Sequence, residues 1–374
     1  MERRKMNILV TGANGFVGKN LCEQLKIMKD VNVFKYDIDS SLEDLERYAK
    51  DCDLIYHLAG VNRPKDEKEF MEGNCDFTKV LLDILSKTGN TPVIAVSSSI
   101  QALLDNPYGK SKRAGEDLIF DYSKKTGARV VVYRFPNVYG KWCRPNYNSA
   151  VATFCNNIAN DLPITVNDPS VMMHLVYIDD VVEELLSVID KNEHVKDGYG
   201  FVPKVTDVPL GKIPELLYYF KESRKSLRLP NLCNPFEKKL YSTYLSYLPE
   251  DGFSYPLLMH EDNRGSFTEF LKSDDRGQVS VNISHPGIVK GNHWHNTKNE
   301  KFLVVSGKGM IKLRKVGTDK VLEYPVSGEK LEVIDIPCGY THSIANVGDC
   351  DMVTVMWVNE VFDESHPDTY FEEV

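Results

Sequence analysis

The stretch "MNILVTGANGFVGKNL" at residues 6–21 decides the fold of the first half of the chain. A short apolar run leads into Gly12, Gly15 and Gly18, and apolar residues then recur at helical spacing. Glycines let a backbone approach a pyrophosphate closely, and the N-terminus of a helix offers unpaired N–H groups to it. The stretch therefore predicts a strand, a glycine-rich turn and a helix that together bind a dinucleotide.

The rest of the chain shows two different sequence patterns. Residues 6 to about 200 alternate β-branched runs with helix-like segments, whereas short strands follow one another closely from about residue 252. The first pattern is typical of βαβ units in a parallel sheet with both faces covered. The second is typical of an all-β barrel or sandwich. We expect a Rossmann-type, doubly wound α/β domain over 1–250 and an all-β domain over 251–374.

The bulk composition excludes several function classes. The net charge of −9 over 374 residues lacks the positive excess that is typical of proteins that bind nucleic acid or an anionic membrane. No apolar run approaches the roughly 18 residues of a membrane helix, and the first residues carry no secretory signal. The eight cysteines are scattered without a CxxC pair, as in reduced proteins. We expect a cytoplasmic protein with small-molecule substrates and no nucleic-acid or membrane partner.

A tyrosine and a lysine mark the expected chemistry of the first domain. Tyr108 and Lys112 in "YGKSK" stand four residues apart, so a helix would place the phenol and the ammonium on one face. A nearby ammonium favours the phenolate and lowers the pKa of a tyrosine. We expect Tyr108 to exchange a proton with a substrate oxygen. A serine cluster at 97–99 ends an apolar run about ten residues earlier.

A second group of polar residues lies far along the chain, in "GNHWHNTKNE" (291–300) and "PCGYTHSIAN" (337–346). In a strand, His293 and His295 would point to the same side. Glu300 follows after a turn, and His342 comes about 40 residues later. Imidazole nitrogens with one carboxylate make a credible site for zinc, iron, nickel or manganese.

Six motifs of the first half resemble the extended short-chain dehydrogenase/reductase family of sugar-nucleotide epimerases and reductases. They are "TGANGFVG", "HLAG", "SSS", "YGKSK", "RFPNVYG" and "VYIDDVV". The resemblance implies a catalytic triad of Ser99, Tyr108 and Lys112, with Ser98 as the alternative serine. It also implies that Asn74 completes a proton relay and that Asn137 lies near the sugar nucleotide. The segment between serine and tyrosine is shorter than usual in this family, which predicts an open substrate pocket.

The same resemblance implies a nicotinamide cofactor. The residues predicted to bind it are Gly12, Gly15, Phe16, Val17, Gly18, Asp37, Leu58, Ala59, Gly60 and Lys112. Asp37 could accept a hydrogen bond from the adenosine ribose and favour NADH, whereas Lys35 could meet the 2′-phosphate of NADPH. The sequence leaves this choice open.

The two histidine-containing stretches resemble both motifs of the cupin superfamily, a small β-barrel. This resemblance implies His293, His295, Glu300 and His342 as the ligands of one divalent metal per chain. In addition, "DNRGSFTEF" (262–270) resembles a segment of sugar-nucleotide 3,5-epimerases. Arg264 in this segment could pair with a diphosphate, since arginine suits bidentate phosphate recognition. The alternative interpretation is a charged hairpin.

Nearly the whole chain resembles the CapF-type bifunctional enzymes of capsular polysaccharide synthesis, with "HLAGVNRP", "FSYPLLM" and "DMVTVMWVNE" among the matching segments. This resemblance implies that the cupin domain epimerises C3 of a UDP-2-acetamido-2,6-dideoxy-4-hexulose. The reductase domain would then reduce the C4 ketone with NADPH to UDP-2-acetamido-2,6-dideoxy-L-talose, on the way to UDP-N-acetyl-L-fucosamine. It also implies a zinc site and a homodimer formed through the cupin domains.

Two other functions stay open at this stage. One is a single-activity reductase or 4-epimerase, in which the cupin domain is stabilised by a metal and serves only for dimerisation. The other is a non-catalytic sensor of NADP(H) or sugar nucleotides. The acid and base of the epimerisation are also open among Lys290, Lys298 and Tyr340, which all lie near the cupin motifs.

Overall fold

The computed structural model describes residues 4–374 and contains two compact units. The first unit runs to Tyr218 and resumes over Pro235–Pro249, and the second comprises Tyr219–Asn234 and Glu250–Val374. Among residues 4–374, no helix combines the length and the apolar character needed to cross a membrane. We describe each unit by itself.

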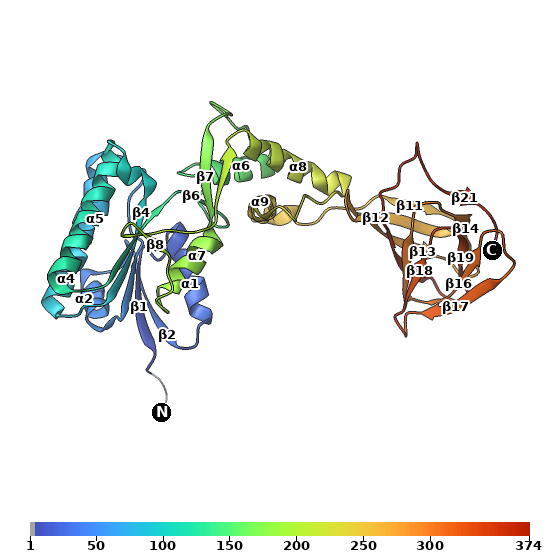
Figure 1. Cartoon of the computed structure of the whole chain (residues 1–374), viewed down its shortest axis with the longest axis horizontal. Coiled ribbons are helices and arrows are strands. Elements are labelled where there is room, and N and C mark those ends of the chain that lie inside the picture. The colour runs from blue at the N-terminus through green and yellow to red at the C-terminus, as the bar shows by residue number, and fades with distance from the viewer. Residues whose placement is uncertain (1–3) are drawn as a thin grey trace. The chain divides into compact units, whose positions relative to one another are not determined.

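The first unit is built on a seven-stranded sheet with the strand order β2-β1-β3-β4-β5-β9-β8. Its parallel strands are β1 (Met6–Thr11), β2 (Val31–Tyr36), β3 (Leu54–His57), β4 (Val93–Ser99), β5 (Val130–Phe135) and β9 (Tyr199–Gly200). The short strand β8 (Val195–Lys196) is antiparallel to β9. Figure 1 shows helices on both faces of this sheet, so the prediction of a Rossmann-like α/β fold is confirmed.

The helices cover the sheet because alternate strand residues point to opposite faces. One face, which includes Ile8 and Val10, packs on α1 (Phe16–Ile27) and α7 (Ile178–Ser187). The other face, which includes Leu9, packs on three further helices. These are α2 (Leu42–Asp51), α4 (Phe77–Thr88) and α5 (Pro107–Thr126).

Several shorter elements complete this region. The α-helical turn α3 (Lys68–Met71) continues directly into a π-helix, η1 (Glu72–Asp76), and then into α4; a 3₁₀ turn, η2 (Ile100–Leu103), follows β4. A three-stranded sheet has the order β10-β7-β6, formed by β6 (Asn137–Tyr139), β7 (Met172–Tyr177) and β10 (Val205–Pro209). The helices α6 (Ala150–Ala159) and α9 (Pro235–Leu245) also belong to the first unit. The helix α8 (Lys212–Ser226) begins in the first unit and ends in the second, and the 3₁₀ turn η3 (Glu250–Gly252) belongs to the second.

The second unit consists of two antiparallel sheets. The six-stranded sheet has the order β11 (Met259–Asp262), β12 (Gly265–Ser273), β13 (Gly277–Ser284), β20 (Met352–Val358), β15 (Glu300–Ser306) and β18 (Val333–Ile336). The five-stranded sheet has the order β17 (Val321–Ser327), β16 (Lys308–Lys315), β19 (Tyr340–Asn346), β14 (Val289–Trp294) and β21 (Tyr370–Phe371). The expectation of an all-β second domain is confirmed.

A buried cluster joins these two sheets. Phe302 and Val304 from the six-stranded sheet pack with Ile311, Leu313 and Ile344 from the five-stranded sheet. The ring of His342 lies 5.8 Å from that of Phe302, centroid to centroid, so the histidine motif sits at the edge of this core.

Candidate functional sites

The glycine-rich loop has a shape that only glycines allow. Gly12 has a φ of +69°, and a Cβ there would lie 2.7 Å from the backbone nitrogen of Ala59. A Cβ on Gly18 would lie 2.1 Å from the carbonyl oxygen of Gly12. Gly15 ends the loop, and α1 begins at Phe16 with the first backbone N–H groups of the helix directed to this end. The loop can therefore present these N–H groups and the positive end of the helix dipole to a phosphate.

A cavity of about 540 Å³ extends from this loop into the first unit. Its lining includes the following residues predicted from sequence: Gly12, Gly15, Phe16, Val17, Gly18, Leu58, Gly60, Ser99, Tyr108, Lys112 and Asn137. Ala59 lies behind the loop, against Gly12. The structure thus brings the predicted dinucleotide loop and the predicted triad to one cavity.

Asp37 lies beside the loop, at the end of β2. Its carboxylate accepts hydrogen bonds from the backbone N–H of Asn14 at 2.7 Å and of Ile38 at 2.8 Å. Asn14 belongs to the cavity lining, so Asp37 braces the glycine loop at the side where an adenosine ribose would lie.

Ser99 and Ser98 have different surroundings. The hydroxyl of Ser99 is hydrogen-bonded to the phenol of Tyr108. The hydroxyl of Ser98 instead donates to the buried carboxylate of Glu116, which is also paired with Arg134. This geometry favours Ser99 over Ser98 as the serine of the triad, although its role stays a prediction.

The expected lowering of the Tyr108 pKa is wrong. Burial raises the pKa of Tyr108, and the hydrogen bond from Ser99 only partly offsets this effect. The amine of Lys112 donates instead to the carbonyl of Ser97 at 3.2 Å. Burial also lowers the pKa of Lys112 to about 8, against the opposing effect of the Glu116 carboxylate. Near neutral pH the phenol is therefore protonated, which is the form that can donate a proton.

Asn74 is held within the π-helix by several hydrogen bonds. Its Oδ1 accepts from the N–H of Val61 at 3.0 Å, and its Nδ2 donates to the carbonyl of Val61 at 2.8 Å and to Ser111 at 3.0 Å. A Cβ on Gly60 would lie 2.7 Å from Asn74 Oδ1 and 2.9 Å from Lys112 Nζ. Gly60 thus makes room for both side chains, and Asn74 lies next to the lysine of the predicted triad.

The sequence reasoning missed two features of this region. The segment after β6 places Trp142, Arg144 and Tyr147 in the cavity lining, and Arg144 and Lys112 are the cationic side chains of that lining. The basic and aromatic residues of "KWCRPNYN" (141–148) could have indicated this role from the sequence.

The second feature is the buried His57, which is hydrogen-bonded to Thr11 at 2.8 Å and to Thr78 at 2.9 Å. Burial lowers its pKa to about 3, so it is a neutral structural residue.

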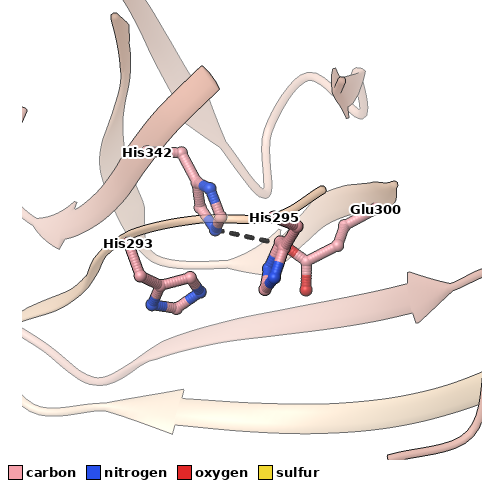
Figure 2. Close-up of side chains that lie close together, drawn as sticks. All are labelled: His293, His295, Glu300 and His342. Carbon is pink, nitrogen blue, oxygen red and sulfur yellow. Dashed lines mark ion pairs between the residues drawn. The ribbon is translucent and has the colours of Figure 1, made fainter. Parts of the chain in front are cut away.

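The four predicted metal ligands converge in the second unit (Figure 2). One potential ligand atom from each of His293, His295, Glu300 and His342 lies within 4.8 Å of the others. Glu300 Oε2 is 3.0 Å from His342 Nε2 and 3.6 Å from His295 Nε2. His293 and His342 are cross-strand partners of β14 and β19, which places their rings on the same face of the sheet.

The buried atoms of this cluster fit a metal ion. His295 Nε2, Glu300 Oε2 and both ring nitrogens of His342 are buried without a hydrogen bond among the described residues 4–374. Buried polar atoms normally have partners, so several unpartnered atoms around one point are compatible with a cation site. The Nδ1–H of His295 donates to the carbonyl of Asp368 at 2.6 Å, which leaves the Nε2 lone pair for a metal.

The protonation states of His293 and Glu300 suit a metal, whereas for His295 the lowering effect of burial is outweighed by Glu300 and the backbone of Asp368, which raise its pKa. Burial, with the neighbouring His342 and His295, lowers the pKa of His293 to about 4. Burial raises the pKa of Glu300, but the adjacent rings of His295 and His342 outweigh this effect and bring the pKa to about 2. At neutral pH, His293 is therefore neutral and Glu300 is ionised, and these are the forms that bind metals.

The remaining predicted residue of this unit, Arg264, lies in an exposed hairpin. β11 and β12 are joined there by two residues, with Asp262 opposite Gly265. The guanidinium of Arg264 pairs with Asp262 at 2.6 Å. Its surroundings are those of a charged hairpin, and its contact with a diphosphate stays a prediction.

Two of the three candidate acid and base residues lie on the inner face. Lys290 is the cross-strand partner of Ile344, and Tyr340, His342 and Ile344 alternate along β19, so these side chains share one face. Lys298, in contrast, donates to the carbonyl of Pro367 in the C-terminal segment at 2.6 Å.

The chain is similar over nearly its whole length to the capsular polysaccharide assembling protein CapF from Staphylococcus aureus. The two are 57% identical, the match covers 99% of this chain and 100% of that one, and the TM-score is 0.94. The chain belongs to the CapF family. The prediction of this family is confirmed.

Other comparisons agree with membership of the CapF family. A UDP-2-acetamido-2,6-beta-L-arabino-hexul-4-ose reductase from Pseudomonas aeruginosa is 46% identical, over 98% of each chain. Residues 8–201 match the NAD dependent epimerase/dehydratase family, and residues 260–370 match the polysaccharide biosynthesis C-terminal domain. A UDP-glucuronic acid 4-epimerase from Bacillus cereus, at 20% identity and a TM-score of 0.55 over 65% of this chain, shares the fold alone.

Proposed function

We propose that the chain is a bifunctional sugar-nucleotide enzyme of capsule synthesis. Residues 251–374, which we propose form a cupin barrel, would epimerise C3 of a UDP-2-acetamido-2,6-dideoxy-4-hexulose. Residues 1–250 would reduce the C4 ketone and produce UDP-2-acetamido-2,6-dideoxy-L-talose, a precursor of UDP-N-acetyl-L-fucosamine. The observation that carries the proposal is the presence of two separate reactive groups of residues in one chain, Ser99–Tyr108–Lys112 and the His/Glu cluster. The name of the Pseudomonas relative, a hexul-4-ose reductase, supports the reduction.

Reduction of the ketone follows from the surroundings of Tyr108. The ketone oxygen would accept hydrogen bonds from Ser99 and Tyr108, which are already bonded to each other. Tyr108 donates its proton to that oxygen, and the raised pKa keeps the proton in place until C4 is reduced. The Lys112 ammonium stabilises the phenolate that remains. When bound, the nicotinamide cofactor supplies the hydride for this step.

Epimerisation requires the loss and return of the proton at C3. This proton is α to the C4 ketone, so it becomes acidic when the resulting enolate is stabilised. A divalent metal, with zinc as our first choice, would be held by His293, His295, Glu300 and His342 and would supply Lewis-acid stabilisation of that charge. One structure of the CapF family contains the inhibitor 3-isopropenyl-tropolone, whose adjacent carbonyl and hydroxyl oxygens resemble the hydroxyketone of the proposed substrate.

Among the candidate acids and bases, the surroundings of Lys290 support it best. Lys290 extends from β14 across the interior, and its amine donates to Asn282 Oδ1 at 2.6 Å and to the carbonyl of Ile283 at 2.8 Å on β13. Burial lowers its pKa, with an opposing effect from Asp262 and a smaller lowering effect from Arg264. An interior amine with a lowered pKa is better suited to proton exchange than an ordinary lysine. We therefore propose Lys290 as one of the two proton-exchanging groups.

We further propose NADPH as the reductant, with NADH as the alternative, and a homodimer formed through the second unit. Asp37 already accepts two backbone N–H groups, so it can support the glycine loop without binding the 2′-hydroxyl that distinguishes NADH. The cavity cation Arg144 is a candidate for the diphosphate of the UDP-sugar.

A single variant separates the two activities. Tyr108→Phe should lower reduction of the 4-keto sugar about 10²–10⁴-fold, because it removes the proton donor. In deuterated water the same variant should still incorporate deuterium at C3. Absence of this exchange would refute the bifunctional proposal and favour a reductase with a structural cupin. If wild-type protein with the 4-keto substrate also fails to oxidise NADPH, the non-catalytic sensor becomes the better explanation.

A further inference from the structure

The C-terminal segment lies directly against β14, the strand that carries His293 and leads directly into His295. β21 pairs with β14, with Phe371 opposite His293 and Tyr370 opposite Trp294. The rings of Trp294 and Tyr370 stack with centroids 4.7 Å apart. β14 is therefore fixed on one side by β19 and on the other by the last residues of the chain.

Asp368 makes two kinds of contact with the metal-ligand segment. Its backbone carbonyl accepts the Nδ1–H of His295 at 2.6 Å. Its carboxylate accepts the backbone N–H groups of Asn296, Thr297 and Lys298 at 3.1, 2.9 and 3.2 Å. The hydroxyl of Thr297 also donates to it at 2.9 Å. One residue thus holds both a ligand ring and the turn that leads from His295 to Glu300.

These contacts have a direct consequence for metal binding. A hydrogen bond at Nδ1 fixes the histidine tautomer in which the Nε2 lone pair is free, and that Nε2 lies 3.6 Å from Glu300. The carboxylate fixes the turn that sets the separation between His295 and Glu300. We infer that Asp368 is a positioning residue for the metal site, although it is not itself a ligand. This inference rests on the metal function proposed for the cluster.

The chain offers a matched control for this inference. Asp363 belongs to the same C-terminal segment, but its carboxylate accepts from Ser365 and pairs with exposed His366. Replacing Asp363 removes a similar charge and a similar local turn without touching residues 295–298. A difference between Asp368 and Asp363 variants therefore reports the contact with the metal-ligand turn.

The test uses the full chain with zinc and cobalt(II) as the probes. Zinc affinity is measured by competition with a chromophoric chelator, for wild type, Asp368→Ala, Asp368→Asn and Asp363→Ala. Asp368→Ala keeps the backbone carbonyl but removes the carboxylate that holds the turn at residues 296–298. Loss of outer contacts around metal ligands typically weakens binding about 10–100-fold, and we expect a loss of this size for Asp368→Ala. Asp368→Asn keeps an oxygen acceptor and should fall between wild type and the alanine variant. The visible spectrum of bound cobalt(II) should change in Asp368→Ala, because the turn that sets the separation between His295 and Glu300 is no longer held by the carboxylate.

The results of these metal-binding measurements can overturn the role of Asp368 in three ways. Zinc affinity within about twofold of wild type, with an unchanged cobalt spectrum, would overturn the inference. If Asp368→Ala does not fold, Asp368→Asn decides in the same way. Equal losses in the Asp363 and Asp368 variants would also overturn it, because the effect would then belong to the whole segment. If wild type binds neither metal, the proposed metal function itself is wrong, and this result is distinct from a failure of the role of Asp368.

Discussion

The lowered pKa of Lys112 predicts how ketone reduction depends on pH. In the proposed reduction the ammonium form is the useful one, since it would stabilise the phenolate formed at Tyr108 and bind the ribose of the cofactor. As pH rises through about 8, this ammonium loses its proton. We therefore expect kcat/KM for NADPH to fall on the alkaline side of pH 8, while the raised pKa of Tyr108 keeps the phenol protonated.

The size of this effect follows from the burial of Lys112. Its pKa moves from 10.5 to about 8. Such a shift corresponds to about 3 kcal/mol of destabilisation of the ammonium, mostly by loss of water around it. The charged fraction then falls from about nine-tenths at pH 7 to about one-tenth at pH 9, so kcat/KM should decrease about tenfold. A lysine with an ordinary pKa would leave kcat/KM constant over this interval.

The assay is the initial rate of NADPH oxidation with the 4-keto UDP-sugar, because kcat/KM reports ionisations of the free enzyme. Lys110→Gln is the matched control: Lys110 is exposed on the same helix and pairs with Asp105, so its loss should leave the profile unchanged. Lys112→Met should be slow at every pH and lose the alkaline decrease. A wild-type profile that is constant or rises between pH 7 and 9 would refute this reasoning.

Four further predictions concern both units. Glu300→Gln should lower metal content after dialysis, measured by elemental analysis, because the ionised ligand is lost; Glu323→Gln, an exposed control, should retain it. Chelation of wild type should lower the melting temperature of the second unit and spare NADPH binding, as followed by calorimetry and fluorescence. Gly18→Ala should weaken NADPH binding at least about tenfold in a titration, since its Cβ would lie 2.1 Å from the Gly12 carbonyl. Arg144→Met should raise KM for the UDP-sugar about tenfold in steady-state kinetics and leave KM for NADPH unchanged, if it binds the diphosphate.

Local motifs explain why much of this molecule could be predicted from sequence. The glycine loop and the Tyr108–Lys112 pair depend on the geometry of one strand, turn or helix, so their spacing carries the information. The same is true of the HxH pair. The family match supports the fold classes that these patterns predicted.

Contacts between residues that are distant in the chain could not be predicted from the sequence patterns. Asp368 meets His295 across 73 positions, and no periodicity links the two. The predicted lowering of the Tyr108 pKa was wrong for two reasons. The pKa depends on how much water the surrounding residues exclude, and the amine of Lys112 donates to the carbonyl of Ser97. The position of Arg144 in the cavity likewise depends on the path of a loop, which composition does not specify.

The π-helix around Asn74 makes the site sensitive to chain length. A π turn contains one residue more than the α-helical turn that it replaces. If one residue of Glu72–Asp76 were deleted, the turn could become α-helical. The flanking α3 and α4 would then keep their relative directions, but side chains inside the former π turn would change direction. Asn74 could not then keep its bonds to both Val61 and Ser111. A deletion in this segment, as well as a substitution of Asn74 itself, would therefore remove this asparagine contact from a related chain.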